Sequence, residues 1–174
     1  MWIIAVDPGT THSAEVHIAV STNGEFDVMP IGIMPNYSVL LPMRSRSTEH
    51  FRPVLVVEQI ESFGMAVGTS VFETVFWTGR FCEAHENIGG RCVRLPRRAI
   101  KLHLCGTSRA KDANIRQALI DRFGGKDVAV GTKNDPGPLY GMKSHLWAAL
   151  AVGITYYDMQ QPGYQDRVAA TTAF

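Results

Sequence analysis

The chain has 174 residues, of which 45% are hydrophobic and 19% are charged, and its formal net charge at pH 7 is +1. This length suits one domain with its own core, without metal or disulfide staples. No apolar run approaches the roughly 18 residues that a membrane span needs, and no secretory signal is evident, so we expect a cytoplasmic protein with no membrane partner. Cys82, Cys92 and Cys105 form no C-x-x-C pair, so we expect reduced, mostly buried thiols.

The opening residues predict a strand, a tight turn and a second strand. Residues 2–6 form an apolar run rich in β-branched side chains, which stops at Asp7-Pro8-Gly9. Residues 11–20 then alternate between apolar and mostly polar, as in a half-buried antiparallel strand. We therefore predict a hairpin with Asp7 at a strand end, where a carboxylate and a nearby glycine suit a hard cation or a phosphate. The alternative is a simple turn aspartate.

The next segments extend this sheet. Residues 26–34 predict a third strand of an antiparallel meander, and residues 37–43 a short helix or irregular segment. Residues 44–52 are polar and expected to be exposed. Residues 54–57 are continuously apolar, which predicts a central strand buried on both faces, and this strand ends in a second carboxylate, Glu58.

A helix is predicted to follow a loop at residues 59–68. Ser70 and Glu73 fit a capping box at its start, and Gly89-Gly90 ends the pattern. We expect one apolar stripe of this helix to face the core, made of Val71, Phe72, Val75, Phe76, Gly79 and Cys82.

The second half of the chain predicts mostly helices. Residues 91–95 form an edge or near-edge strand, and Pro96 opens a helix over residues 97–105 that Gly106 stops. The remaining segments are an amphipathic helix at 111–123, a loop at 126–141 and a final helix at 144–157. We expect one domain over residues 1–160 and a frayed tail over residues 161–174.

Positive charge is concentrated in one segment. Residues 91–111 contain no Asp or Glu and seven basic residues: Arg91, Arg94, Arg97, Arg98, Lys101, Arg109 and Lys111. Such a segment is a candidate phosphate-contacting surface, although a solvated face would have the same composition.

Two strand-terminal carboxylates suggest a metal site. If their strands are adjacent and parallel, about 4.8 Å apart, Asp7 and Glu58 can share one divalent cation. His145, in the first turn of the last predicted helix, is the candidate third ligand. Taken alone, His145 would more often be a capping or packing residue.

Four blocks of the sequence resemble the RuvC-like Holliday junction resolvases of the RNase H-like superfamily, particularly the short forms of bacteria and bacteriophages. The blocks are IIAVDPGTT at residues 3–11, VVEQIESFGM at 56–65, RLPRRAIKLHLCGTSRAKDANIRQAL at 94–119, and HLWAALAVGITYY at 145–157. The resemblance implies an α/β fold: a single RNase H-like domain with a mixed five-stranded sheet flanked by helices.

The resemblance also implies a chemistry, in which two Mg²⁺ or Mn²⁺ ions per active site support the attack of water on a DNA phosphodiester. Asp7 and Glu58 match the first two metal ligands, and His145 matches a position that is Asp or His in the family. Seven further residues match positions that contact DNA: Lys101 and the catalytic Lys111 at the scissile phosphates, Arg97, Arg98 and Arg109 on the backbone, and Phe63, with Met65 close by, at the junction centre.

The family acts on a four-way junction by two symmetric incisions, so the resemblance implies a homodimer. The helix at residues 70–86 and the surroundings of Phe51 are the two candidate contact regions.

One block departs from the family pattern. The resemblance implies ligands at i and i+3 of the last helix, but this chain has Ala148 three residues after His145, which leaves three ligands where four are expected. Asp158 is about 20 Å further along a helix, whereas Asp135 could reach the site from the preceding loop. The other explanation is replacement of Asp by Ala, and we favour such a catalytically disabled form because every other block is intact.

Three other interpretations remain open. Residues 7–11 also resemble the first phosphate-binding element of the actin and hexokinase ATPases, but that class needs a second lobe. Another RNase H-like nuclease, acting on RNA–DNA hybrids, flaps or forks, would share the fold, since function is set by the site. A junction-binding protein without catalysis is supported only by Ala148.

Overall fold

The computed structural model describes residues 1–43, 52–62, 64 and 66–164. Its strands are β1 (Trp2–Asp7), β2 (His12–Val20), β3 (Phe26–Pro35), β4 (Val54–Gln59) and β5 (Arg91–Pro96). Its helices are α1 (Asn36–Met43), α2 (Thr69–Glu86), α3 (Arg97–Cys105), α4 (Asp112–Arg122), α5 (Lys126–Ala129) and α6 (Leu146–Met159). None of the helices in these ranges has the length and apolar character needed to cross a bilayer.

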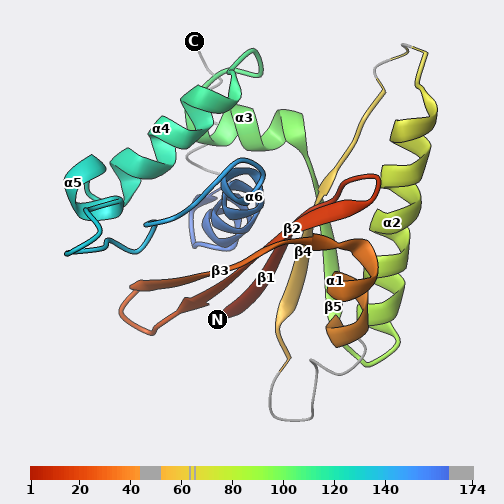
Figure 1. Ribbon diagram of the computed structural model, residues 1–174, viewed down its shortest axis with the longest axis horizontal. Coiled ribbons are helices and arrows are strands. Elements are labelled where there is room, and N and C mark those ends of the chain that lie inside the picture. The colour runs from red at the N-terminus through yellow and green to blue at the C-terminus, as the bar shows by residue number, and fades with distance from the viewer. Residues whose placement is uncertain (44–51, 63, 65, 165–174) are drawn as a thin grey trace.

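The strands form one mixed sheet in the order β3-β2-β1-β4-β5 (Figure 1). The first three strands are an antiparallel meander, while β4 pairs parallel with β1 and β5 pairs parallel with β4. The predicted mixed five-stranded sheet is therefore confirmed, and so is the parallel pairing of the two strands that end in Asp7 and Glu58.

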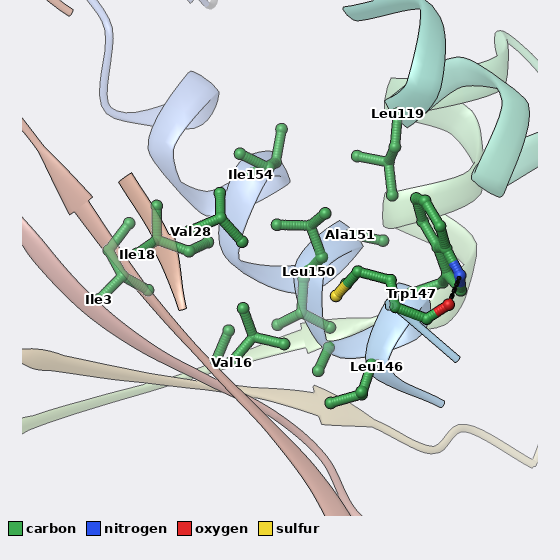
Figure 2. Close-up of a cluster of buried hydrophobic side chains, with 14 of the residues drawn as sticks. Ile3, Val16, Ile18, Val28, Leu119, Leu146, Trp147, Leu150, Ala151 and Ile154 are labelled. Atoms are coloured by element: carbon green, nitrogen blue, oxygen red, sulfur yellow. Dashed lines mark hydrogen bonds between the residues drawn. The ribbon is translucent and has the colours of Figure 1, made fainter. Parts of the chain in front are cut away.

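Helix α6 covers one face of the sheet, with α3 and α4 packed beside it (Figure 1). Its buried side chains meet those of β1 and β2, as Figure 2 shows for Leu150 and Ile154 opposite Val16 and Ile18. The helix comes close to the strands because of Gly153, where a Cβ would lie 2.5 Å from Ile18 Cδ1 and 3.0 Å from Ala5 Cβ. This packing fixes the start of α6 relative to the strand ends.

Helices α1 and α2 cover the opposite face (Figure 1). The sequence predicts that β2 is buried on one face only, but α1 and α2 bury the second face as well. Ser13 and Glu15, on the face of β2 away from α6, are as buried as Val16. The Ser13 hydroxyl donates to Asn36 Oδ1 at 2.7 Å, so a polar side chain is accommodated there by a hydrogen bond.

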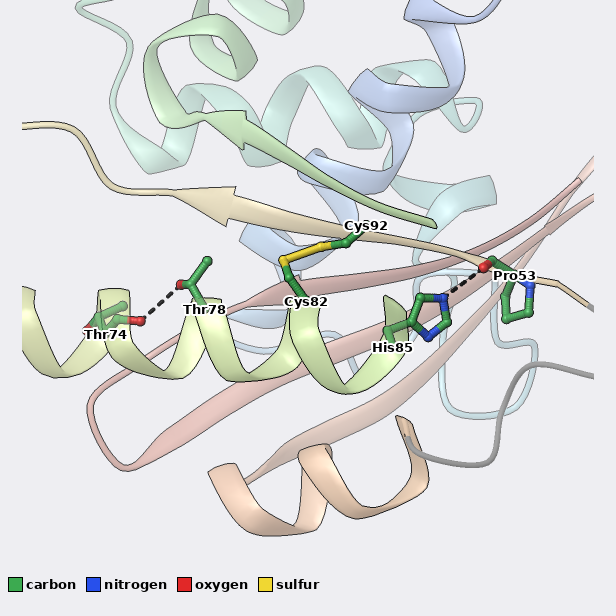
Figure 3. The surroundings of a disulfide bond; sticks show 6 residues. All are labelled: Pro53, Thr74, Thr78, Cys82, His85 and Cys92. Atoms are coloured by element: carbon green, nitrogen blue, oxygen red, sulfur yellow. Dashed lines mark hydrogen bonds between the residues drawn. A yellow bond between two sulfur atoms is a disulfide. The ribbon is translucent and has the colours of Figure 1, made fainter. Parts of the chain in front are cut away.

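The prediction for α2 is wrong about which side of the helix faces the sheet. The helix begins at Thr69 after Gly68, without a side-chain cap, so the Ser70 capping box is absent. The predicted core stripe is largely exposed, and the buried side instead carries Thr74, Trp77, Thr78, Phe81, Ala84 and His85. The threonines are tolerated because their hydroxyls donate to helix carbonyl oxygens one turn earlier, as Thr78 does to Thr74 in Figure 3.

The expectation of three reduced thiols is also wrong, because Cys82 and Cys92 form a disulfide (Figure 3). The helix α2 packs against β5, which brings the two Cα atoms to 5.3 Å although the residues are 10 positions apart. Nearby, the buried His85 ring donates from Nε2 to the carbonyl oxygen of Pro53 at 2.9 Å. Cys105 is a free, half-buried thiol, and burial raises its pKa.

Smaller differences concern the last third of the chain. The predicted loop at 126–141 contains the one-turn helix α5, and α6 begins at Leu146 with His145 as its N-cap residue. Residues 44–51, expected to be exposed, and residues 165–174 of the predicted tail lie outside the described residues.

Candidate active site

The site lies where β1 and β4 end. Val6 pairs with Val57 in parallel register, so Asp7 and Glu58 emerge next to each other at the same edge of the sheet. The turn after Asp7 needs glycine, because a Cβ on Gly9 would overlap the carbonyl oxygen of His12. Asn36 donates from Nδ2 to the Gly9 carbonyl at 3.0 Å and so ties this turn to α1.

His145 joins the carboxylates from the start of α6. It donates from Nδ1 to Asp7 Oδ2 at 2.9 Å, and a neutral imidazole bound in this way carries its lone pair on Nε2. The His145 side chain is 68% exposed and that of Asp7 only 12% exposed, so the imidazole covers the carboxylate from the solvent side. Ser144, just before it, has a positive φ of 39°, which turns the chain into the helix.

Both carboxyl groups have raised pKa values. Burial is the largest cause in each case, and the neighbouring charge of Asp7 raises the pKa of Glu58 further. Hydrogen bonding from His145 acts against the shift of Asp7, and the guanidinium of Arg97 acts against that of Glu58. Two buried, mutually repelling carboxylates are stabilised by a cation between or beside them.

The structure places a guanidinium at Glu58. Arg97 donates from Nη1 to both Glu58 oxygens, at 2.7 and 2.8 Å, and from Nη2 to Asp112 Oδ1 at 2.5 Å. The contact follows from the sheet, because Glu58 pairs with Leu95 and α3 begins two residues later. The sequence predicts a DNA-backbone contact for Arg97, whereas this guanidinium binds two carboxylates.

The side chains of Asp7, Glu58, Arg97 and His145 line one pocket of about 440 Å³. Its wall consists of Asp7, Glu58, Ile60, Arg97, Asp112, Ile115, Ser144, His145, Trp147 and Ala148. Sequence reasoning missed Asp112; its only signal was that it is the first acidic residue after the basic segment 91–111.

The other acidic residues weighed for the site lie elsewhere. Asp158 accepts hydrogen bonds from His103 at 2.7 Å and from Arg122 at 2.6 and 2.7 Å. Burial acts to raise the pKa of Asp158, but these hydrogen bonds outweigh it and the pKa is lowered. Asp135 is not among the residues of the pocket wall.

The donor set fits a hard divalent cation, because it combines carboxylate oxygens with one imidazole nitrogen. Within the described ranges, however, no three Asp, Glu, His or Cys side chains converge closely enough to hold a metal ion as they stand. Arg97 is bound to both oxygens of Glu58 in this arrangement.

Some of the candidate DNA contacts lie beside this pocket. Arg98 and Lys101 line an adjoining hollow with Arg97 and Ser108. Lys111 is the N-cap residue of α4, directly before Asp112, and Arg109 is exposed in the preceding loop. The two remaining candidates, Phe63 and Met65, lie outside the described residues.

Comparison with solved structures defines the class of fold. The chain has a RuvC-like fold of the RNase H type, matched over nearly its whole length. One similar structure is Thermus thermophilus RuvC, with a TM-score of 0.61, 18% identity and coverage of 97% of both chains. Another is T. thermophilus RuvC in complex with a Holliday junction substrate, with a TM-score of 0.66, 18% identity and coverage of 97% of this chain and 96% of that chain. No protein-family model and no curated protein matches the sequence.

Proposed function

We propose that this chain is a metal-dependent endonuclease that resolves four-way DNA junctions by paired symmetric cuts. The observation that carries the proposal is the meeting of Asp7, Glu58 and His145 in one pocket at the carboxyl ends of two parallel strands. The RuvC-like fold supports the proposal, since one of the similar structures holds a Holliday junction.

Asp7, Glu58 and His145 would hold Mg²⁺ or Mn²⁺, two ions per site. Bound ions of this kind lower the pKa of an attacking water and stabilise the charge on a leaving oxygen. The protein holds these side chains in place: two buried strands fix the carboxylates, and the hydrogen bond that His145 donates to Asp7 fixes the imidazole.

The basic surface beside the pocket would bind the phosphates of the junction arms. Arg98 and Lys101 line a hollow that shares Arg97 with the carboxylate pocket, and Lys111 directly precedes Asp112, so a strand bound by these side chains would pass the carboxylates. Such binding depends on salt, because each neutralised phosphate releases counterions.

We further propose that the active form is a homodimer, because a four-way junction is cut at two symmetry-related positions. Its contact would be the α1–α2 apolar face, defined as Tyr37 and Leu41 of α1 with Phe72, Val75 and Phe76 of α2, all of which are exposed. The rings of Tyr37 and Phe76 both contact Arg80, so the two helices present one continuous surface. Of the two candidate regions from the sequence, α2 is thus favoured, and Phe51 lies outside the described residues.

The test is a cleavage assay on a labelled synthetic four-way junction with Mg²⁺ or Mn²⁺, with flap, fork and RNA–DNA hybrid substrates alongside. We expect paired symmetric nicks in the junction, and loss of cutting in Asp7→Asn. The sequence by itself favours a chain that Ala148 disables, and comparison with Ala148→Asp tests that alternative: cutting by the Ala148→Asp form alone would mean that the absent carboxylate disables the chain. Cutting of flaps or hybrids in preference to the junction would favour another RNase H-like activity, and binding without cutting in both forms would favour a non-catalytic junction-binding protein.

A further inference from the structure

Building on the proposed function, we propose that Asp112 supplies the carboxylate that Ala148 cannot, and that the Arg97 guanidinium marks the cation position between Asp112 and Glu58. The metal site would then draw its ligands from β1, β4, the start of α6 and the start of α4. A chain with Ala148 would retain a complete set of ligands.

The first argument is the place of Asp112 in the fold. It is the first residue of α4 and belongs to the wall of the pocket that also contains Asp7, Glu58 and His145. Its negative charge is close enough to act on both strand-terminal carboxyl groups, raising the pKa of Asp7 and of Glu58. Ala148 lines the same pocket, so a carboxylate at position 148 would enter the cavity that Asp112 already lines.

The second argument is the cation that the protein itself provides. A guanidinium bound to three carboxylate oxygens on two side chains shows that this position favours positive charge. The Asp112 part of this contact is open to solvent, because the Asp112 side chain is 81% exposed, whereas that of Glu58 is only 9% exposed. Asp112 can therefore rearrange at little cost, and a divalent cation that took the position of the guanidinium would still neutralise the buried charge of Glu58.

The third argument is that the acidic alternatives are otherwise engaged. Asp158 is held by Arg122 and His103 near the C-terminal end of α6, and Asp135 does not line the pocket. Asp112 is thus the only acidic residue, among those in the described ranges, that joins Asp7 and Glu58 in the pocket wall.

The test measures Mn²⁺ binding to the intact protein without DNA, by the electron paramagnetic resonance signal of free Mn²⁺. We expect Asp112→Asn to weaken binding at one of two ions by about tenfold or more. Asp121→Asn, an exposed aspartate on the same helix that is bonded to Gln117, is the matched control and should bind as the parent chain does. Arg97→Gln removes the competing cation and should tighten binding about tenfold.

A rescue variant separates a ligand from a merely structural residue. Adding Ala148→Asp to Asp112→Asn should restore the lost ion, because a carboxylate returns to the same pocket. Unchanged Mn²⁺ binding in Asp112→Asn would overturn the assignment of Asp112, and unchanged binding in Arg97→Gln would overturn the cation position. These results do not require cleavage: a chain that binds two ions through Asp112 but leaves junctions uncut would contradict the proposed function and keep this inference.

Discussion

Replacing Phe76 by Asp should separate the proposed homodimer into monomers. Phe76 is 56% exposed in the single chain, and complete burial of a Phe side chain is worth about 1.5–3 kcal/mol, so covering its exposed part offers about 1–1.5 kcal/mol. A twofold contact contains the residue twice, which doubles the loss to about 2–3 kcal/mol. The dimer dissociation constant should therefore rise roughly 30- to 150-fold, and further because a carboxylate is desolvated.

Sedimentation equilibrium over a range of protein concentrations measures this constant directly. Val128→Asp is the matched control, since Val128 is 62% exposed but lies on α5, on the other side of the sheet. Circular dichroism should show both variants folded, because neither side chain is part of the core. A Phe76→Asp protein that dimerises as tightly as the Val128→Asp protein would refute the assignment of the α1–α2 apolar face to the contact.

Three further predictions address the site and the fold. Glu58→Gln should slow junction cleavage about a thousandfold, because metal ligation is worth several kcal/mol, while junction binding persists. Single-turnover kinetics measures the cleavage and gel shift measures the binding. Cleavage at the parent rate would contradict the assignment of Glu58 as a metal ligand. Lys101→Gln should reduce the slope of log affinity against log salt by about 1, and an unchanged slope would exclude a phosphate contact. Asp158→Asn should lower the unfolding free energy at pH 7 by about 1–2 kcal/mol in urea titrations, because bonds from His103 and Arg122 are lost. The pKa of Asp158 is lowered in the folded protein, so the difference in unfolding free energy between the parent and the variant should disappear as the pH falls from about 4 through that pKa. A difference that stays constant with pH would argue against the charged hydrogen bonds as its cause.

Local patterns in the sequence determined the sheet and the two strand-end carboxylates. The apolar runs before Asp7 and Glu58 are continuous because both strands are buried on both faces, and such runs are visible without any tertiary information. The helix over 97–105 was equally predictable, because Pro96 and Gly106 act through their own backbone preferences, and Gly106 indeed adopts φ 70°.

Only the tertiary structure decided which side of each helix packs on the sheet and which distant residues become neighbours. The periodicity of α2 reveals an apolar stripe, but it does not say whether the stripe packs on the core or on another chain. In this protein the side of α2 that carries Trp77 and Phe81 covers the sheet. The Cys82–Cys92 disulfide and the approach of Asp112 to Glu58 depend on how helices pack onto the sheet. Residues far apart in sequence become neighbours through such packing, which no local pattern encodes.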